Sequence, residues 1–147
     1  MAVVTFKATS RKLPEGLAVE SDVRGFKMVL DEPEDLGGTN KGMNPVEALL
    51  CALGSCQSIV AAVFAEQQGI NLQEFWVELE GDLDTDGFMG LSDVRPGFLE
   101  VRFKMHIKSD SPEDKVKEFA KFIEKRCPVG DTLANGVKLV SSGVVIE

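Results

Sequence analysis

The sequence predicts an α+β fold whose strands pair mostly in antiparallel fashion, and three observations carry this prediction. Residues 75–84 and residues 99–108 each alternate between apolar and charged side chains, which is the period of a strand with one solvated face. A long apolar helix is expected before them, and an amphipathic helix after them. The resulting order of strands, helix, strand pair, helix and strand is typical of the α+β class.

The length and charge of the chain indicate how many domains it forms and which partners it disfavours. With 147 residues, it is expected to form one domain over residues 1–147. Its 16 Lys and Arg against 24 Asp and Glu give a net charge of −8, which disfavours binding to the phosphates of nucleic acid. No uninterrupted apolar run reaches the ~18 residues of a membrane-spanning helix, and the first residues lack the pattern of a signal peptide. We therefore expect a cytoplasmic protein without membrane contact.

The first forty residues are expected to form strands and a loop. Residues 3–8 indicate a strand, and residues 11–16 a turn. Residues 17–30 are rich in Val and Phe with an interruption near Asp22, which fits either a strand pair or one bent strand. The Gly, Pro and Asp content of residues 31–42 predicts a loop.

The strongest helix signal begins at Asn44. This residue can cap the helix, Pro45 suits its first turn, and Glu47 stands where a capping box places its acidic residue. The helix is expected to run to about Gln68, with Gly69 as its stop. Its middle is apolar or small around most of its girth, so it must be buried on most sides. Since a domain of this size rarely encloses such a helix alone, the pattern predicts a homodimer.

The two alternating stretches also match in charge. The polar side of residues 75–84 is acidic and that of residues 99–108 is basic. If the two strands pair, opposite charges can therefore face each other across them.

The segment between these strands contains an accidental motif. Residues 82–93 carry aspartates and a glycine at the spacing of a calcium loop. Such a loop needs a helix on either side, whereas the preceding residues alternate as a strand and Pro96 follows closely. We therefore interpret the segment as an acidic hairpin loop and expect no metal there.

A second helix is expected from Ser111 to just before Cys127, because Pro128 disfavours helical geometry in the residue before it. Cys127 then either ends this helix or begins a short helix over residues 128–134. In the first case, the negative end of the helix dipole disfavours the thiolate of Cys127. Residues 137–146 are expected to close the chain as a strand.

The three cysteines are the candidates for chemistry. An odd number of them in a chain without an export signal indicates free thiols. One histidine and no CxxC pair argue against a zinc site, and no cofactor is expected. Cys56 is the candidate nucleophile, because small residues beside it leave room for a ligand. Cys51 is interpreted as a packing residue, and Cys127 is the second candidate because thiols distant in sequence can meet in the fold.

Two cysteine motifs and a glycine pair resemble the OsmC/Ohr family of hydroperoxide-resistance proteins. The matching residues are Asn44-Pro-Val-Glu-Ala-Leu-Leu-Cys-Ala-Leu-Gly-Ser-Cys56, Gly37-Gly38 before it, and Cys127-Pro-Val129 with Thr132-Leu133. The order of elements fits the family over nearly the whole chain. The resemblance implies an intertwined homodimer, in which antiparallel sheets wrap around long buried central helices and two active sites form at the dimer interface.

The resemblance also implies an activity and a role for each cysteine. Cys56 matches the peroxidatic cysteine, whose thiolate attacks an organic hydroperoxide to give an alcohol and a sulfenic acid. Cys127 matches the resolving cysteine, which condenses with that acid to a Cys56–Cys127 disulfide. An external dithiol of the lipoyl type then reduces the disulfide.

Other polar roles follow from the same resemblance. The family's activating arginine comes from the N-terminal strands, where Arg11 and Arg24 are the candidates and Arg11 is slightly favoured by its position at a turn. The family's peroxidases place a glutamate directly after Asn-Pro, but this chain has Val46 there and Glu47 one residue later. Glu47 is thus either a catalytic partner or a helix cap. Because some branches lack that glutamate, the alternative function is a non-enzymatic dimer that binds a small ligand or senses thiols.

Overall fold

The computed structural model describes residues 2–147. They form two compact units, of which the first ends at Leu49 and the second begins at Leu50. The first unit holds a three-stranded sheet and the start of the long helix. The second holds the rest of that helix, a two-stranded sheet and three shorter helices. Both sheets are antiparallel, so the predicted α+β class is confirmed. A single functional domain over residues 1–147 stays a prediction.

The first sheet consists of β1 (Thr9–Lys12), β2 (Val19–Val23) and β3 (Phe26–Leu30) in that order. The expected strand pair over residues 17–30 is therefore the correct alternative, and its turn lies at Arg24 and Gly25, both with positive φ.

The expected strand over residues 3–8 is wrong, because these residues are exposed and no described strand supplies a hydrogen-bonded ladder for them. The expected turn over residues 11–16 begins too early, since Arg11 pairs with Glu20 and Lys12 with Val19.

The expected loop after β3 contains one short 3-10 helix, η1 (Glu34–Leu36), that was not expected, and it is organised around one buried carboxylate. Asp31 accepts hydrogen bonds from the Glu32 N–H at 2.7 Å, the Thr39 hydroxyl at 2.7 Å, the Thr39 N–H at 3.3 Å and the Lys41 N–H at 3.1 Å. These donors, the Thr39 hydroxyl foremost, lower the pKa of Asp31 to about 2. Gly38 is required in this loop, because a Cβ there would lie 1.9 Å from the carbonyl oxygen of Glu32.

The long helix α1 (Pro45–Phe64) begins with the predicted capping box. The Glu47 N–H donates to Asn44 Oδ1 at 2.8 Å, and the Asn44 N–H donates to Glu47 Oε1 at 2.9 Å. The helix ends four residues before the expected Gln68. A hydrogen-bonded turn follows, and it closes at Gly69 with positive φ.

Burial of α1 within the single chain covers one side rather than most of the girth. Its buried residues are Leu53, Gly54, Gln57, Val60 and Ala61. On the opposite side, Ile59 is 64% exposed and Val63 is 63% exposed. By length and mean composition α1 is apolar enough to cross a membrane, although Ser55, Gln57 and Ser58 interrupt its apolar run. Its buried side chains belong to the core of the second unit.

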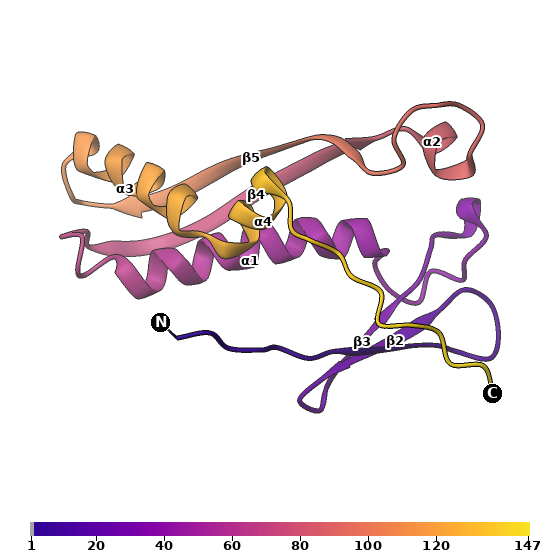
Figure 1. Ribbon diagram of the computed structural model, residues 1–147. Helices are drawn as coiled ribbons and strands as arrows, with labels where there is room; N and C mark the ends of the chain where they lie inside the picture. The colour runs from indigo at the N-terminus through magenta and orange to yellow at the C-terminus, as the bar shows by residue number, and fades with distance from the viewer. Residues whose placement is uncertain (1) are drawn as a thin grey trace. The chain divides into compact units, whose positions relative to one another are not determined.

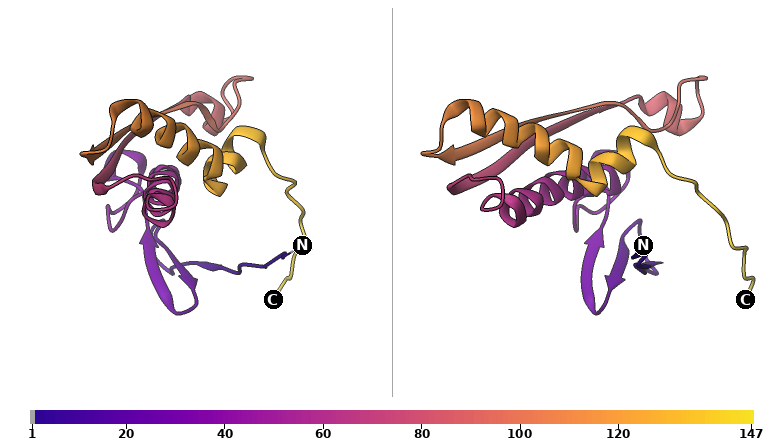
Figure 2. Two further views of the ribbon diagram at one scale, coloured as in Figure 1. Left: turned by 90° about the vertical axis from the view of Figure 1, so that its left-hand side faces the viewer. Right: turned by 60° about the vertical axis from the view of Figure 1, so that its left-hand side comes forward.

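The core of the second unit lies between α1, the hairpin of β4 (Leu72–Leu83) and β5 (Phe98–Ser109), and α3 (Glu113–Arg126). Figures 1 and 2 show α1 and α3 running beside this hairpin. Buried apolar side chains join these elements, namely Val60, Ala61, Ala65, Ile70, Phe119 and Ile123. The small residue Gly54 lets β4 approach α1, because a Cβ there would lie 2.7 Å from Leu79 Cδ1.

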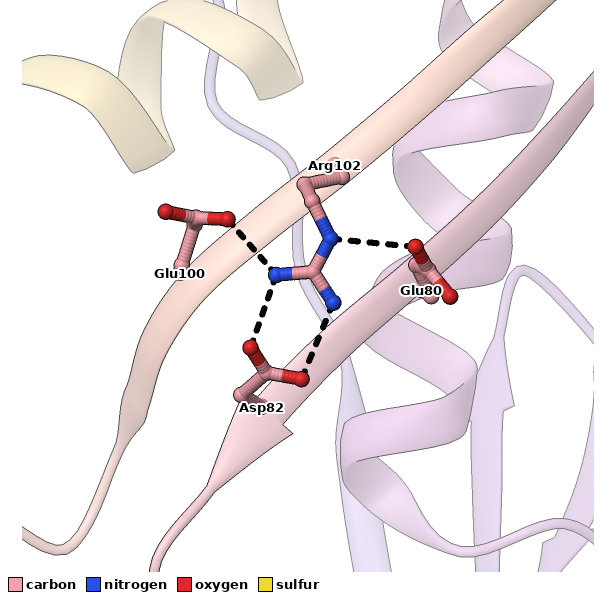
Figure 3. Close-up of polar contacts among 4 residues, drawn as sticks. All are labelled: Glu80, Asp82, Glu100 and Arg102. Carbon is pink, nitrogen blue, oxygen red and sulfur yellow. Dashed lines mark hydrogen bonds and ion pairs between the residues drawn. The ribbon is translucent and has the colours of Figure 1, made fainter.

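The outer face of the hairpin carries the expected pairing of opposite charges. Glu78 faces Lys104 and Glu80 faces Arg102, whereas the acidic pair Asp82 and Glu100 also face each other. The Arg102 guanidinium bonds Glu80 at 3.0 Å, Asp82 at 2.7 and 3.0 Å and Glu100 at 2.6 Å, as Figure 3 shows. One cation thus holds three carboxylates together.

The connection between β4 and β5 is the expected hairpin loop, with a short helix that was not expected. Helix α2 (Thr85–Met89) begins after Asp84, whose Oδ1 accepts a hydrogen bond from the Asp86 N–H at 2.9 Å. Two of the aspartates in the calcium-like spacing therefore have other partners, since Asp82 pairs with Arg102 and Asp84 caps α2.

The C-terminal part contains α3, then α4 (Pro128–Asn135), with Cys127 between them. The second alternative for Cys127, the start of a short helix, is therefore correct. The expected strand over residues 137–146 is wrong: its apolar side chains are 67–92% exposed, and no described strand pairs with it. Apolar, β-branched composition favours a strand, but a strand forms only where a neighbour satisfies its backbone.

Candidate active site

Cys56 lies in the middle of α1, where the helix meets the core of the second unit. The helix body places it one position before the buried Gln57 and four before the buried Val60. Its side chain is half-buried and packs against the core cluster. Cys56 is therefore held by a long helix at the edge of the core, and the residue remains partly exposed.

Cys127 is positioned by two helices at once. Its N–H donates to the Ile123 carbonyl at 3.0 Å and so ends α3. Its Sγ accepts a hydrogen bond from the Gly130 N–H at 3.3 Å and so caps α4. The residue is 1% exposed. A Cβ at Gly130 would lie 3.7 Å from Leu53 Cδ1, so the first turn of α4 approaches the same side of α1 that carries Cys56.

The structure brings the two candidate thiols together. Burial raises the pKa of Cys127 above its usual range, and a hydrogen bond with the Cys56 side chain raises it further. The Gly130 N–H acts in the opposite direction without reversing the shift. Cys127 is therefore harder to ionise than an ordinary cysteine, and Cys56 is the more exposed of the two residues. Two neighbouring thiols can also convert between dithiol and disulfide.

The structure reveals a buried polar group next to Cys56 in the chain that the sequence pattern did not single out. Gln57 is 1% exposed, and its Oε1 has no hydrogen-bond partner among the described residues. A buried, unpaired amide oxygen is costly, so such groups are rare in folded proteins. The sequence signal that could have found it is a glutamine at an otherwise apolar helical position.

The other predicted site residues belong to the first unit, whereas both contacting cysteines belong to the second. Arg11 is exposed on β1, and the Arg24 guanidinium lies over the ring of Phe26 at 5.2 Å. The Glu47 carboxylate accepts the Asn44 N–H, which supports the helix-cap interpretation. Catalytic roles for Arg11, Arg24 and Glu47 stay predictions.

The remaining candidates lie apart from this pair. Cys51 is exposed. Among residues 2–147, no group of three or more His, Cys, Asp or Glu side chains is arranged to hold a metal ion. A pocket of about 410 Å³ lies at the middle of the β4–β5 hairpin and is lined by Glu78, Leu79, Glu80, Arg102, Phe103 and Lys104. Its lining contains neither Cys56 nor Cys127.

Gly130 is the site residue that sequence reasoning missed. The pattern that could have found it is Cys127-Pro128, because proline is favoured at the first position of a helix and the preceding residue then becomes the cap. The amide three residues after the cap is the donor that such a cap receives.

One protein-family model matches most of the chain. The family model described as OsmC-like protein matches residues 38–142. This segment includes Cys56 and Cys127, and it begins at Gly38, the second glycine of the pair before α1.

Two curated proteins named hydroperoxide reductase are similar to the chain. The protein of Mycoplasma genitalium is 32% identical over 112 residues, which are 74% of this chain and 72% of that protein. The protein of Mycoplasma pneumoniae is 33% identical over 98 residues, which are 65% of this chain and 64% of that protein. Among solved structures, the crystal structure of an OsmC like protein from Mycoplasma pneumoniae gives a TM-score of 0.78 at 26% identity and covers 89% of this chain and 88% of that chain.

Proposed function

The chain belongs to the OsmC-like protein family, and on that premise we propose that it is a thiol-dependent peroxidase that reduces organic hydroperoxides. Two relatives of similar sequence are named hydroperoxide reductase, which supports a peroxidase role in general. The single observation that supports the cysteine mechanism is that the Cys56 side chain lies near enough to Cys127 to raise its pKa, while the two residues differ in burial.

In the first step, the Cys56 thiolate attacks the distal oxygen of the hydroperoxide. A sulfur–oxygen bond forms, the oxygen–oxygen bond breaks, and the alkoxide leaves as an alcohol after it takes up a proton. Cys56 loses two electrons and becomes a sulfenic acid. The position of Cys56 supports this step, because the residue is only half-buried and its neighbours are apolar, as is the organic part of the substrate.

In the second step, Cys127 condenses with this sulfenic acid to a Cys56–Cys127 disulfide, and water leaves. An external dithiol then gives two electrons and two protons, which restores both thiols and oxidises the dithiol to its own disulfide. The raised pKa of the buried Cys127 supports its assignment as the resolving rather than the attacking thiol. We assign the reductant to the lipoyl type of dithiol.

A cation near Cys56 would stabilise its thiolate. Arg11 and Arg24 are the proposed sources, with Arg11 preferred, and Glu47 is proposed mainly as the cap of α1. We also propose that the chain acts in the cytoplasm as a homodimer, with no nucleic acid or membrane as partner. The exposed apolar side of α1 supports the dimer, because solvent contact at Ile59 and Val63 is unfavourable in a single chain.

The test is steady-state consumption of cumene hydroperoxide with a lipoyl-type dithiol or with glutathione as reductant. We expect turnover by the unaltered protein with the dithiol, faster than with glutathione, and no turnover by Cys56→Ser. Cys51→Ser is the matched control and should retain activity, because Cys51 lies outside the contacting pair. A Cys56→Ser variant that consumes hydroperoxide as fast as the unaltered protein would eliminate the proposal.

A further inference from the structure

Cys127 is the N-cap residue of α4. In α4, the Gly130 N–H donates to Cys127 Sγ at 3.3 Å, and the Asp131 N–H donates to the Cys127 carbonyl at 2.9 Å. This is the geometry in which Ser, Thr, Asp or Asn normally receives the first free amides of a helix. Those amides and the helix dipole give the N-terminus a partial positive charge, which favours an anion at the cap.

We propose that the N-terminus of α4 activates Cys127 for disulfide formation, with the Gly130 N–H holding the Cys127 thiolate as it attacks oxidised Cys56. This inference rests on the proposed peroxidase function and adds Gly130 to it as a positioning residue. In the step, a bond forms between the two Sγ atoms and the sulfur–oxygen bond of Cys56 breaks. The departing hydroxide combines with the proton that Cys127 released, so water leaves and no further oxidant is needed.

The same amides oppose the effect of burial on Cys127. Burial and the neighbouring Cys56 side chain raise the pKa of Cys127, whereas the N–H groups of Gly130 and Val129 lower it. The amides of α4 therefore stabilise the charged form of Cys127 that attacks oxidised Cys56.

Two substitutions at Gly130 differ in whether they keep the N–H that donates to Cys127. A Cβ at Gly130 would lie 3.5 Å from Cys127 Cβ and 3.6 Å from Cys127 Sγ, which are ordinary contact distances. Gly130→Ala therefore keeps the N–H and has room for its methyl group. Gly130→Pro removes the N–H, in the first turn of a helix, where proline is best tolerated.

The experiment mixes each variant with one equivalent of cumene hydroperoxide and follows sulfenic acid by dimedone trapping and disulfide by intact mass. We expect Gly130→Pro to form the disulfide about tenfold more slowly than Gly130→Ala, because one hydrogen bond to a charged group is lost. Oxidation of Cys56 should proceed at equal rates in both. Equal rates of disulfide formation would overturn the inference alone. If the unaltered protein forms neither sulfenic acid nor the Cys56–Cys127 disulfide, the proposed function fails and the inference fails with it.

A second measurement depends neither on the proline variant nor on peroxide. In the Cys56→Ser protein, the amide proton resonance of Gly130 is followed by NMR while Cys127 is ionised at alkaline pH. A donor to the thiolate should move downfield with the midpoint of the thiol titration, and further than the amides in the body of α3. A merely structural role of Gly130 would leave this resonance unresponsive, and that result would overturn the inference.

Discussion

Cys127 combines two roles at the scale of the single residue, since its sulfur caps α4 and contacts Cys56. Serine at this position keeps an acceptor for the Gly130 N–H, whereas alanine removes it. We therefore predict that Cys127→Ala is about 1 kcal/mol less stable than Cys127→Ser. Urea unfolding under reducing conditions measures the difference.

The control for this prediction is the same pair of substitutions at Cys51, an exposed position within α1. There alanine should be the more stable variant, because it has the higher helix propensity and no cap is involved. If alanine is also at least as stable as serine at Cys127, the sulfur does not act as a cap.

Asp31 gives a prediction of pH dependence. Its pKa is about 2 in the folded protein against 3.8 for an ordinary aspartate. A lowered pKa means that the carboxylate stabilises the fold above about pH 4 and that this contribution is lost as the pH falls towards about 2. Asp31→Asn should therefore be less stable at neutral pH, and its deficit should shrink over that interval. Chemical unfolding of both proteins across acidic pH measures this difference.

The exposed Asp35 provides the comparison, since Asp35→Asn should follow the unaltered protein at every pH. A deficit of Asp31→Asn that stays constant down to the lowest pH would mean that the four donors around Asp31 do not favour its charged form.

At the residue scale, the sequence predicted candidate residues wherever the signal is local. Cys56 and Cys127 were identified from their motifs, and the Asn44–Glu47 capping box from its spacing, because these signals are local. The hydrogen bond from Gly130 also has a local signal, the Cys127-Pro128 pair, whereas the unpaired state of the Gln57 oxygen depends on which side chains pack around it, which no local pattern encodes.

At the scale of elements, one cation on the β4–β5 hairpin, Arg102, binds three carboxylates. Hydrogen bonds with Asp82, Glu100 and Glu80, that with Asp82 foremost, raise the pKa of Arg102, and Arg102 in turn lowers the pKa of Asp82. Arg102→Gln should destabilise the protein at neutral pH by leaving the three carboxylates together. The loss should diminish as the pH falls, because the lowered pKa of Asp82 stabilises only while its carboxylate is ionised. Unfolding at neutral and acidic pH measures this trend.

Adding Asp82→Asn to Arg102→Gln should recover part of the lost stability, because it removes one of the repelling charges. A double variant that is less stable than Arg102→Gln would show that Asp82 contributes something other than charge.

Strands could be predicted from the sequence where the strand that pairs with them follows closely in the chain. The alternation of β4 and β5 implied both their faces and their complementary charges, and the two strands pair with each other. Residues 3–8 and 137–146 have equally good strand composition but form none, because composition does not supply a neighbouring strand. Helix α2 was missed since five residues are too few for a periodic pattern.

At the scale of the whole molecule, the exposed side of α1 is the feature that a single chain leaves unexplained. Ile59 and Val63 lie there at more than 60% exposure. If a second copy covers this side, Ile59→Asp should weaken association by roughly a hundredfold or more, since a charge would be buried without a partner. Sedimentation velocity over a range of concentrations measures the shift from dimer to monomer.

The control for association is Gln68→Asp, which adds the same charge at an exposed position beyond the end of α1. It should leave the dimer intact. An unaltered protein that sediments as a monomer at every concentration would contradict the proposed homodimer.

A redox pair of Cys56 and Cys127 can be detected by adding one equivalent of cumene hydroperoxide to the reduced protein, blocking free thiols, and mapping disulfides by peptide mass spectrometry. We expect one intrachain link between Cys56 and Cys127, with Cys51 recovered in its blocked form. A protein whose Cys56 and Cys127 are both recovered unlinked, or whose disulfide joins Cys51 instead, would contradict this expectation.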